Sequence, residues 1–169
     1  MSEFLGRFTT PVDVVDLGCG DFNVGRQIRR KAARYVGCDV VPDLISRNRE
    51  MYNDLDVDFR IVDISEDDLP GGDVVIIRQV LQHLSNDAIM RVVKKLGQFR
   101  YLVQTGFVPS GDFVPNVDQP TGAYSRLARG ITSGIVLPAH PFNLQVEREE
   151  LICETPEQQG FLKVIVYEL

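Results

Sequence analysis

Short apolar runs alternate with amphipathic stretches along the first two thirds of the chain. The runs are rich in β-branched residues, a composition typical of buried strands. They cover residues 12–18, 34–40, 57–63, 72–80 and 101–108. Between them, apolar residues at helical spacing predict helices over residues 23–33, after Pro42 and after Ser85. We expect Asn23 or Asp21 to cap the first of these helices and Ser85 to cap the third.

This alternation predicts an α/β fold of the Rossmann-like, doubly wound type. Parallel strands that are joined by helices form a sheet with helices on both faces. From residue 109 to 141 the chain is instead rich in Pro, Gly, Ser and Asp without a period, which is typical of a functional loop. The last residues predict two strands joined at Gln158–Gly160. We therefore expect a mostly parallel seven-stranded sheet with an antiparallel C-terminal strand.

Composition and charge argue against several classes of function for this protein. The 169 residues, 44% of them hydrophobic, fit a single domain over residues 1–169. The net charge of -6 argues against nucleic acid as the main partner, because a nucleic-acid-binding face needs an excess of Lys and Arg. No apolar run could span a membrane and the N-terminus lacks a signal-peptide pattern, so we expect a cytoplasmic protein. We expect Cys19, Cys38 and Cys153 to be free thiols, and no spacing predicts a metal site.

Residues 14–25, VVDLGCGDFNVG, place glycines where the first strand should give way to a helix. Such glycines indicate that the backbone passes close to a ligand, and ligands of open α/β sheets bind beyond the carboxyl ends of the strands. A dinucleotide site needs G-x-G-x-x-G, and here the third glycine, Gly25, comes too late. Asp16 is unfavourable beside phosphates but suits a cationic ligand that carries an amino group and a sulfonium.

The glycine turn resembles motif I of the class I S-adenosylmethionine-dependent methyltransferases, in which an acidic residue precedes Gly-x-Gly-x-Gly. Asp16, Gly18 and Gly20 match this pattern, and Phe22 stands in place of the last glycine. The resemblance covers about residues 12–108 and implies that this part is the cofactor half of the domain. Residues from about 109 to 142 would then form the acceptor loop, and residues from about 143 to 169 the closing strands.

The resemblance also implies roles for residues at the ends of later strands. Asp39 would hold the ribose hydroxyls, although dinucleotide enzymes carry an acidic residue there as well. Asp63 would accept from the adenine amino group with Ile64 packed on the ring, and Arg78 and Gln79 would line the methionine end. The implied cofactor-binding set is Asp16, Gly18, Cys19, Gly20, Phe22, Asn23, Asp39, Val40, Asp63, Ile64, Arg78 and Gln79. The reaction would convert S-adenosylmethionine into S-adenosylhomocysteine.

An oxygen acceptor of high pKa needs a base for methyl transfer. His83, in the segment QHLS after the fourth strand, is placed to serve, or it packs against the strand ends and bonds to backbone. His140, at the end of the long loop, could face the acceptor instead. Asp21 is a third candidate near the methyl group, and Arg78 could also anchor a carboxylate or hydroxyls of the acceptor.

Absent motifs narrow the acceptor. No Asn/Asp-Pro-Pro-Tyr follows the fourth strand, no Pro-Cys pair supplies a nucleophile for cytosine C5, and no acidic cluster suggests magnesium. The loop carries polar side chains that suit a sugar or similar polyol, namely Tyr124, Arg126, Arg129, His140 and Asn143. We therefore expect O-methylation of a small polar acceptor such as a sugar. The alternatives are an inactive cofactor-binding partner or regulatory subunit and an RNA methyltransferase, which the net charge disfavours.

Overall fold

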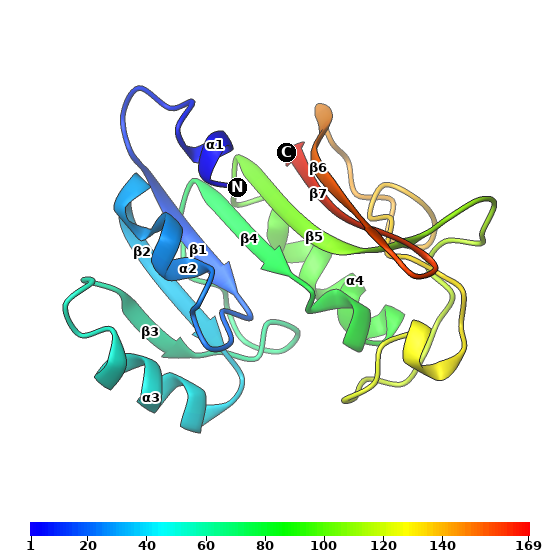
Figure 1. Cartoon of the computed structure of the whole chain (residues 1–169), viewed down its shortest axis with the longest axis horizontal. Coiled ribbons are helices and arrows are strands. Elements are labelled where there is room, and N and C mark those ends of the chain that lie inside the picture. Colours follow the sequence, from blue (N-terminus) through cyan, green and yellow to red (C-terminus); the bar gives the residue numbers. More distant parts are fainter.

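A mixed sheet of seven strands runs through the molecule in the order β3-β2-β1-β4-β5-β7-β6 (Figure 1). The structure is a computed structural model that describes all 169 residues. Its strands are β1 (Val12–Leu17), β2 (Ala32–Asp39), β3 (Asp58–Ile61), β4 (Val74–Arg78), β5 (Tyr101–Pro109), β6 (Arg148–Glu157) and β7 (Gly160–Glu168). The first five are parallel, and β7 runs antiparallel to both β5 and β6. The predicted fold class is therefore confirmed, and the chain order reverses between β1 and β4, where such sheets bind ligands.

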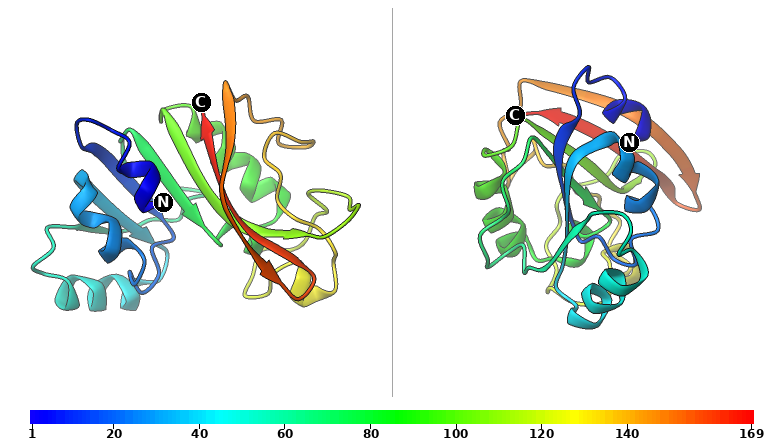
Figure 2. Two further views of the ribbon diagram at one scale, coloured as in Figure 1. Left: turned by 45° about the horizontal axis from the view of Figure 1, so that its top comes forward. Right: turned by 90° about the vertical axis from the view of Figure 1, so that its left-hand side faces the viewer.

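Helices cover both faces of the sheet, and each face has its own hydrophobic core (Figure 2). The helices are α1 (Ser2–Leu5), α2 (Gly25–Ile28), α3 (Pro42–Met51) and α4 (Asn86–Leu96). Ile28 of α2 and Ile45 of α3 are buried in one core, and Ile89 and Val92 of α4 are buried in the other. Ser85 caps α4 as predicted. The longest helix, α4, has 11 residues, and no helix is long and apolar enough to cross a membrane.

The first predicted helix is shorter than its apolar spacing suggested. Instead of a helix over residues 23–33, the chain forms the single turn α2 and a 3-10 turn, η1 (Arg29–Lys31). The strand β2 begins already at Ala32, because that residue pairs with β1 and its carbonyl accepts from the Arg29 guanidinium at 2.9 Å. The predicted cap is also wrong, since Val24 is the N-cap and no side chain bonds to the helix start.

The long segment between β5 and β6, residues 110–147, has one short 3-10 helix, η3 (Leu127–Arg129). Buried polar side chains replace regular structure there. The Asn116 side chain accepts from Val136 N at 2.8 Å and donates to the carbonyls of Val136 at 2.9 Å and His140 at 3.0 Å. Arg126, only 2% exposed, donates to the Val117 carbonyl at 2.7 Å. The segment is therefore an ordered part of the fold, and η3 lies beside the tip of the β6–β7 hairpin (Figures 1 and 2).

Candidate functional site

The glycine turn after β1 is held against the end of β2. The amides of Gly18 and Cys19 both donate to the Cys38 carbonyl at 2.8 Å. Gly18 has φ 82° and Gly20 has φ 56°, a left-handed conformation that glycine adopts at least cost. A Cβ added to Gly18 would also lie 2.1 Å from a methyl carbon of Val80, which follows β4. The turn therefore passes tightly between the ends of β2 and β4, which only glycine at position 18 allows.

Phe22 stands where the motif has its last glycine, and it keeps a left-handed backbone conformation there, but its side chain packs into the protein. Its φ is 61°, and its ring is fully buried in the hydrophobic core. The ring centroid lies 5.4 Å from that of Tyr35, 5.2 Å from Tyr52 and 4.9 Å from Phe59, all edge-to-face. A Cβ on Gly25 would come within 2.1 Å of this ring, so Gly25 makes room for Phe22.

A cavity of about 510 Å³ opens at the carboxyl ends of β1, β2 and β4 and beside the segment that follows β3. Eight of the predicted cofactor residues line it, together with the candidate base His83. The eight are Gly18, Gly20, Asp39, Val40, Asp63, Ile64, Arg78 and Gln79. The remaining walls, which the sequence did not indicate, are Val62, Ser65, Val80, Leu84, Thr121 and Gly122. Residues far apart in the chain thus converge where the fold predicts a ligand.

Two carboxylates at the wall of this cavity are fixed by short local hydrogen bonds. Asp39 accepts from the Gly20 amide through Oδ2 and from the Val41 amide through Oδ1, both at 3.0 Å. Asp63 Oδ1 accepts from the Ser65 amide at 2.9 Å and its hydroxyl at 2.8 Å. Burial alone would raise the pKa of Asp63, but the bonds from Ser65, the Glu66 amide and the charge of Lys95 together outweigh it and lower the pKa. Both side chains keep lone pairs for ligand hydroxyl or amino groups.

Asp16, two residues before Gly18, is buried, does not line the cavity itself and has a buried oxygen without a partner. Its Oδ2 accepts from the Tyr35 hydroxyl at 3.0 Å, whereas Oδ1 has no hydrogen-bond donor. Burial raises the pKa of Asp16 to about 6, against the effects of the Tyr35 bond and the Arg78 charge. A buried carboxylate with an unused acceptor fits a ligand that carries an ammonium group, which agrees with the sequence-based choice of a cationic cofactor.

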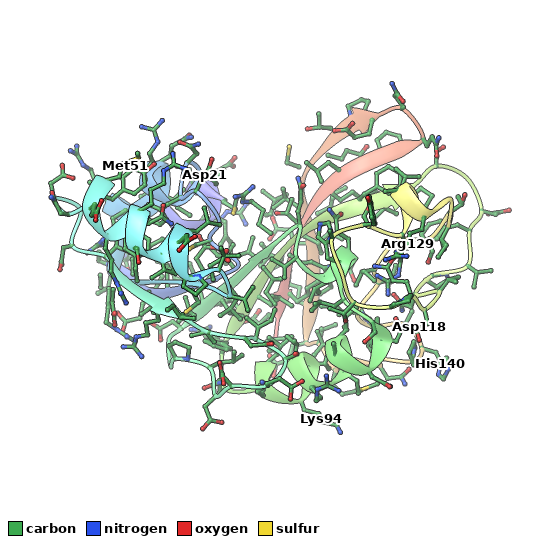
Figure 3. The ribbon with its side chains drawn as sticks, turned by 90° about the horizontal axis from the view of Figure 1, so that it is seen from below. Asp21, Met51, Lys94, Asp118, Arg129 and His140 are labelled. Carbon is green, nitrogen blue, oxygen red and sulfur yellow. The ribbon has the colours of Figure 1, made fainter.

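Several predicted site residues lie elsewhere. The Cys19 side chain is buried in the core behind the turn, where burial raises the pKa of its thiol. Asn23 and Asp21 are exposed and bond to each other, and the Asn23 amide is the main cause that lowers the pKa of Asp21. Neither lines the cavity. His140 is also exposed, and Figure 3 shows it on the opposite side of the molecule from Asp21.

His83 is the one predicted base that lines the cavity. Its Nδ1 is buried without a hydrogen-bond partner, and its Nε2 lies 3.3 Å from the Gln82 amide nitrogen. The ring makes no bond to backbone, although the His83 carbonyl accepts from the Gly122 amide at 3.0 Å. His83 is therefore the candidate base whose position beside the cavity fits a catalytic role.

A second cavity, of about 280 Å³, adjoins the first, and Gln79 lines both. Gln79 has φ 57°, an unusual conformation for a residue with a side chain, and its amide donates to the Thr105 carbonyl at 2.8 Å. The walls come from four parts of the chain that are distant in sequence. They include Gln79, Gln82, Phe107, Ser125, Arg126, Leu127, Ser133, Gly134, Ile135, Glu157, Gln158, Gln159 and Leu162. Of these, only Gln79 and Arg126 were predicted from the sequence as site residues. The others are ordinary loop, strand and turn residues that no motif marks.

The remaining polar residues predicted for the acceptor do not gather there. Tyr124 is 64% exposed and its ring is covered by the Arg129 guanidinium at 5.7 Å. Asn143 is exposed on the far part of the same segment. Arg126 does line the second cavity, but its donors bond to the Val117 carbonyl and to Asn86 Oδ1, so it mainly holds the segment in place.

The comparison with known families agrees with this geometry. A sequence profile of the family described as "Methyltransferase domain" matches residues 15–107, more than half of the 169 residues. The match begins inside β1 and ends inside β5, so it spans the glycine turn and both carboxylates of the larger cavity. No curated protein sequence matches the chain.

Solved structures share the fold. The N-terminal domain of EvdMO1, crystallised in the presence of SAH and D-fucose, aligns with a TM-score of 0.69 at 15% identity, over 98% of this chain and 79% of that one. An S-adenosylmethionine-dependent methyltransferase from Mesorhizobium loti aligns with a TM-score of 0.63 at 17% identity, over 98% and 96%. WbdD aligns with a TM-score of 0.64 at 22% identity, over 99% of this chain and 37% of that one. At these identities the likeness concerns the fold.

Proposed function

The chain belongs to the methyltransferase-domain family and is an S-adenosylmethionine-dependent methyltransferase, and from this premise we propose that it methylates a hydroxyl group of a small polar acceptor such as a sugar. The observation that carries the proposal is the second cavity, which meets the cofactor cavity at Gln79. Its walls offer amide and hydroxyl groups, which suit an acceptor rich in hydroxyls. Its volume of about 280 Å³ suits a small molecule better than a polymer.

In the proposed arrangement the larger cavity takes the cofactor. Asp39 holds the ribose hydroxyls and Asp63 the adenine amino group, with Ile64 against the ring. Asp16 and Arg78 serve the ammonium and carboxylate of the methionine part, because they are the oppositely charged groups at that end. When bound, the cofactor supplies an electrophilic methyl group on a sulfonium. The chain's own task is then to orient the hydroxyl and to exclude water around it.

His83 is the proposed acceptor of the hydroxyl proton. It is the candidate base that lines the cofactor cavity, and its Nδ1 is free of other partners. A neutral imidazole can take the proton as the oxygen–carbon bond forms, and it returns the proton to water afterwards. Asp21 and His140 are not part of this proposal, because they lie outside both cavities.

Calorimetric titration and a transfer assay test the proposal together. We expect heat on titration with S-adenosylmethionine or S-adenosylhomocysteine and none with NAD. With S-adenosylmethionine labelled in the methyl group, label should pass to monosaccharides or their methyl glycosides and not to RNA. Cofactor binding without transfer to any hydroxyl compound of a broad panel would overturn the proposed acceptor class and favour an inactive partner subunit.

A further inference from the structure

The tip of the β6–β7 hairpin is locked onto the end of β5. Gly160 pairs with Pro109, and the Gln159 carbonyl accepts from Ser110 through its amide at 3.0 Å and its hydroxyl at 3.3 Å. A Cβ on Gly160 would lie 2.2 Å from the Val108 carbonyl oxygen, so only glycine permits this close approach. The position of the turn relative to β5 is therefore fixed by backbone contacts and does not depend on its side chains.

Three polar side chains of this turn, Glu157, Gln158 and Gln159, line the second cavity. Gln79 bonds to Thr105 of β5, whereas the turn bonds next to Pro109, four residues further along that strand. Four residues of strand advance by about 13 Å. Gln79, next to the cofactor, and the hairpin turn therefore lie at two ends of the cavity.

The part between these ends is apolar on one side. Phe107 lies between Thr105 and Pro109 on β5, pairs with Leu162 of β7, and lines the cavity together with it. A sugar ring presents C–H groups on its faces and hydroxyls around its rim. An aromatic and an aliphatic side chain suit the face, whereas a carboxylate and amides suit the rim, because a carboxylate accepts from two neighbouring hydroxyls and an amide both donates and accepts.

We propose that the hairpin turn Glu157–Gln159 is the acceptor-recognition element of this methyltransferase. It holds hydroxyls of a sugar ring that lies on Phe107 and Leu162, and the hydroxyl to be methylated points towards Gln79. The inference rests on the proposed function and adds the substrate class, a single sugar ring, and the residues that select it. Glu157 and its two neighbours act in binding and take no part in moving the proton.

Binding of sugars to the S-adenosylhomocysteine-loaded protein tests this inference without turnover. The probes are D-fucose, D-galactose and methyl β-D-galactopyranoside, followed by saturation-transfer NMR. We expect at least one probe to bind and its affinity to fall about tenfold in Glu157→Gln, the magnitude of one hydrogen bond to a charged group. Gln158→Ala should weaken the same probe, and calorimetry should show an unchanged affinity for S-adenosylhomocysteine in both variants.

Glu149→Gln is the matched control, because Glu149 is exposed on the same strand and makes the same change of charge outside either cavity. It should leave sugar binding unchanged, and thermal melting should show all three variants folded.

Equal binding of the sugar by Glu157→Gln, Gln158→Ala and the wild type would overturn the inference and leave the proposed function standing. If none of the sugars binds the loaded wild type, the inference is also wrong, whereas the proposed function is decided separately by methyl transfer to hydroxyl compounds. In the transfer assay, Glu157→Gln should raise the acceptor KM and leave kcat unchanged, which a general loss of structure would not do.

Discussion

Replacing Asp16 by Asn should make the cofactor-free protein more stable and at the same time weaken cofactor binding. Burial raises the pKa of this carboxyl from 3.8 to about 6, so the folded protein holds the proton over a range in which the unfolded chain has lost it. Between these two values the folded state binds more protons, and its stability therefore falls as the pH rises. The side chain is charged at pH 7.5, and the charge then lowers the free energy of unfolding by about 3 kcal/mol.

The substitution removes this charge but introduces an amide. The Asn oxygen can still accept from the Tyr35 hydroxyl, whereas the amide nitrogen takes the place of an oxygen that has no partner. An unpaired buried donor costs about 1–3 kcal/mol, so with a cost near the middle of this range the net gain at pH 7.5 is about 1 kcal/mol. In a domain of this size that gain raises Tm by about 2–4 °C. Below pH 4 the wild-type carboxyl is protonated as well, and the variant should then melt at or below the wild type.

The affinity for the cofactor should change in the opposite direction. Without the carboxylate, the ammonium of S-adenosylhomocysteine loses a charged partner, which costs about 1.5–3 kcal/mol and weakens binding about tenfold to a hundredfold. Thermal melts at pH 7.5 and pH 4 and calorimetric titration at pH 7.5 measure the two effects. A variant that binds S-adenosylhomocysteine as tightly as the wild type would refute the assigned role, and a lower Tm at pH 7.5 would refute the burial argument.

Three further predictions test the glycine turn and the proposed base. Gly18→Ala combines a left-handed backbone with a clash and should lower the free energy of unfolding by well over 2 kcal/mol, whereas Gly20→Ala has open space around its Cβ and should lower it by only about 1–2 kcal/mol. Urea unfolding compares the two variants, and equal losses of stability would contradict the tight passage at position 18. Gly25→Ala should lower the free energy of unfolding by about 1–3 kcal/mol in the wild type but hardly change it in the Phe22→Gly background, where the ring is absent. If the two substitutions are instead additive in the double mutant, the Phe22 ring is not the cause of the destabilisation. His83→Gln should lower kcat about a hundredfold or more at an unchanged affinity for S-adenosylhomocysteine, and a normal kcat would exclude it as the base.

The cavity beside the glycine turn could be predicted from the sequence because its signals are local. Gly18 and Gly20 sit where a strand ends, and a carboxylate at the end of the next strand, Asp39, is brought to them by the parallel pairing of β1 and β2. The hairpin was also predictable, since Gln158–Gly160 separates two runs of strand-forming residues.

The acceptor side could not be predicted, because contacts between distant residues create it. The same holds for one residue of the glycine motif, Phe22, because only the aromatic cluster around it decides that its ring points into the core. The segment 110–147 has no hydrophobic period, and side chains such as Gln119, which donates to the Gln82 carbonyl at 2.8 Å, determine its course. His140 looked suitable because it lies at the end of this long loop, but its place on the surface follows from the course of the loop.

The hydrogen bonds of residues 110–147 limit which parts of such an enzyme can change when its acceptor preference changes. Arg126, Gln119 and Gly122 all donate to carbonyls of the short stretch Leu81–His83, and His83 lines the proposed cofactor cavity. Exchanging this segment would leave those carbonyls without donors and would disturb cofactor binding as well. The side chains at the hairpin tip make no such bonds, because the turn is held through its own backbone, by pairing with β5 and by the bonds from Ser110. New acceptors should therefore be gained by changes at residues 157–159, where evolution or design can act without loss of the cofactor.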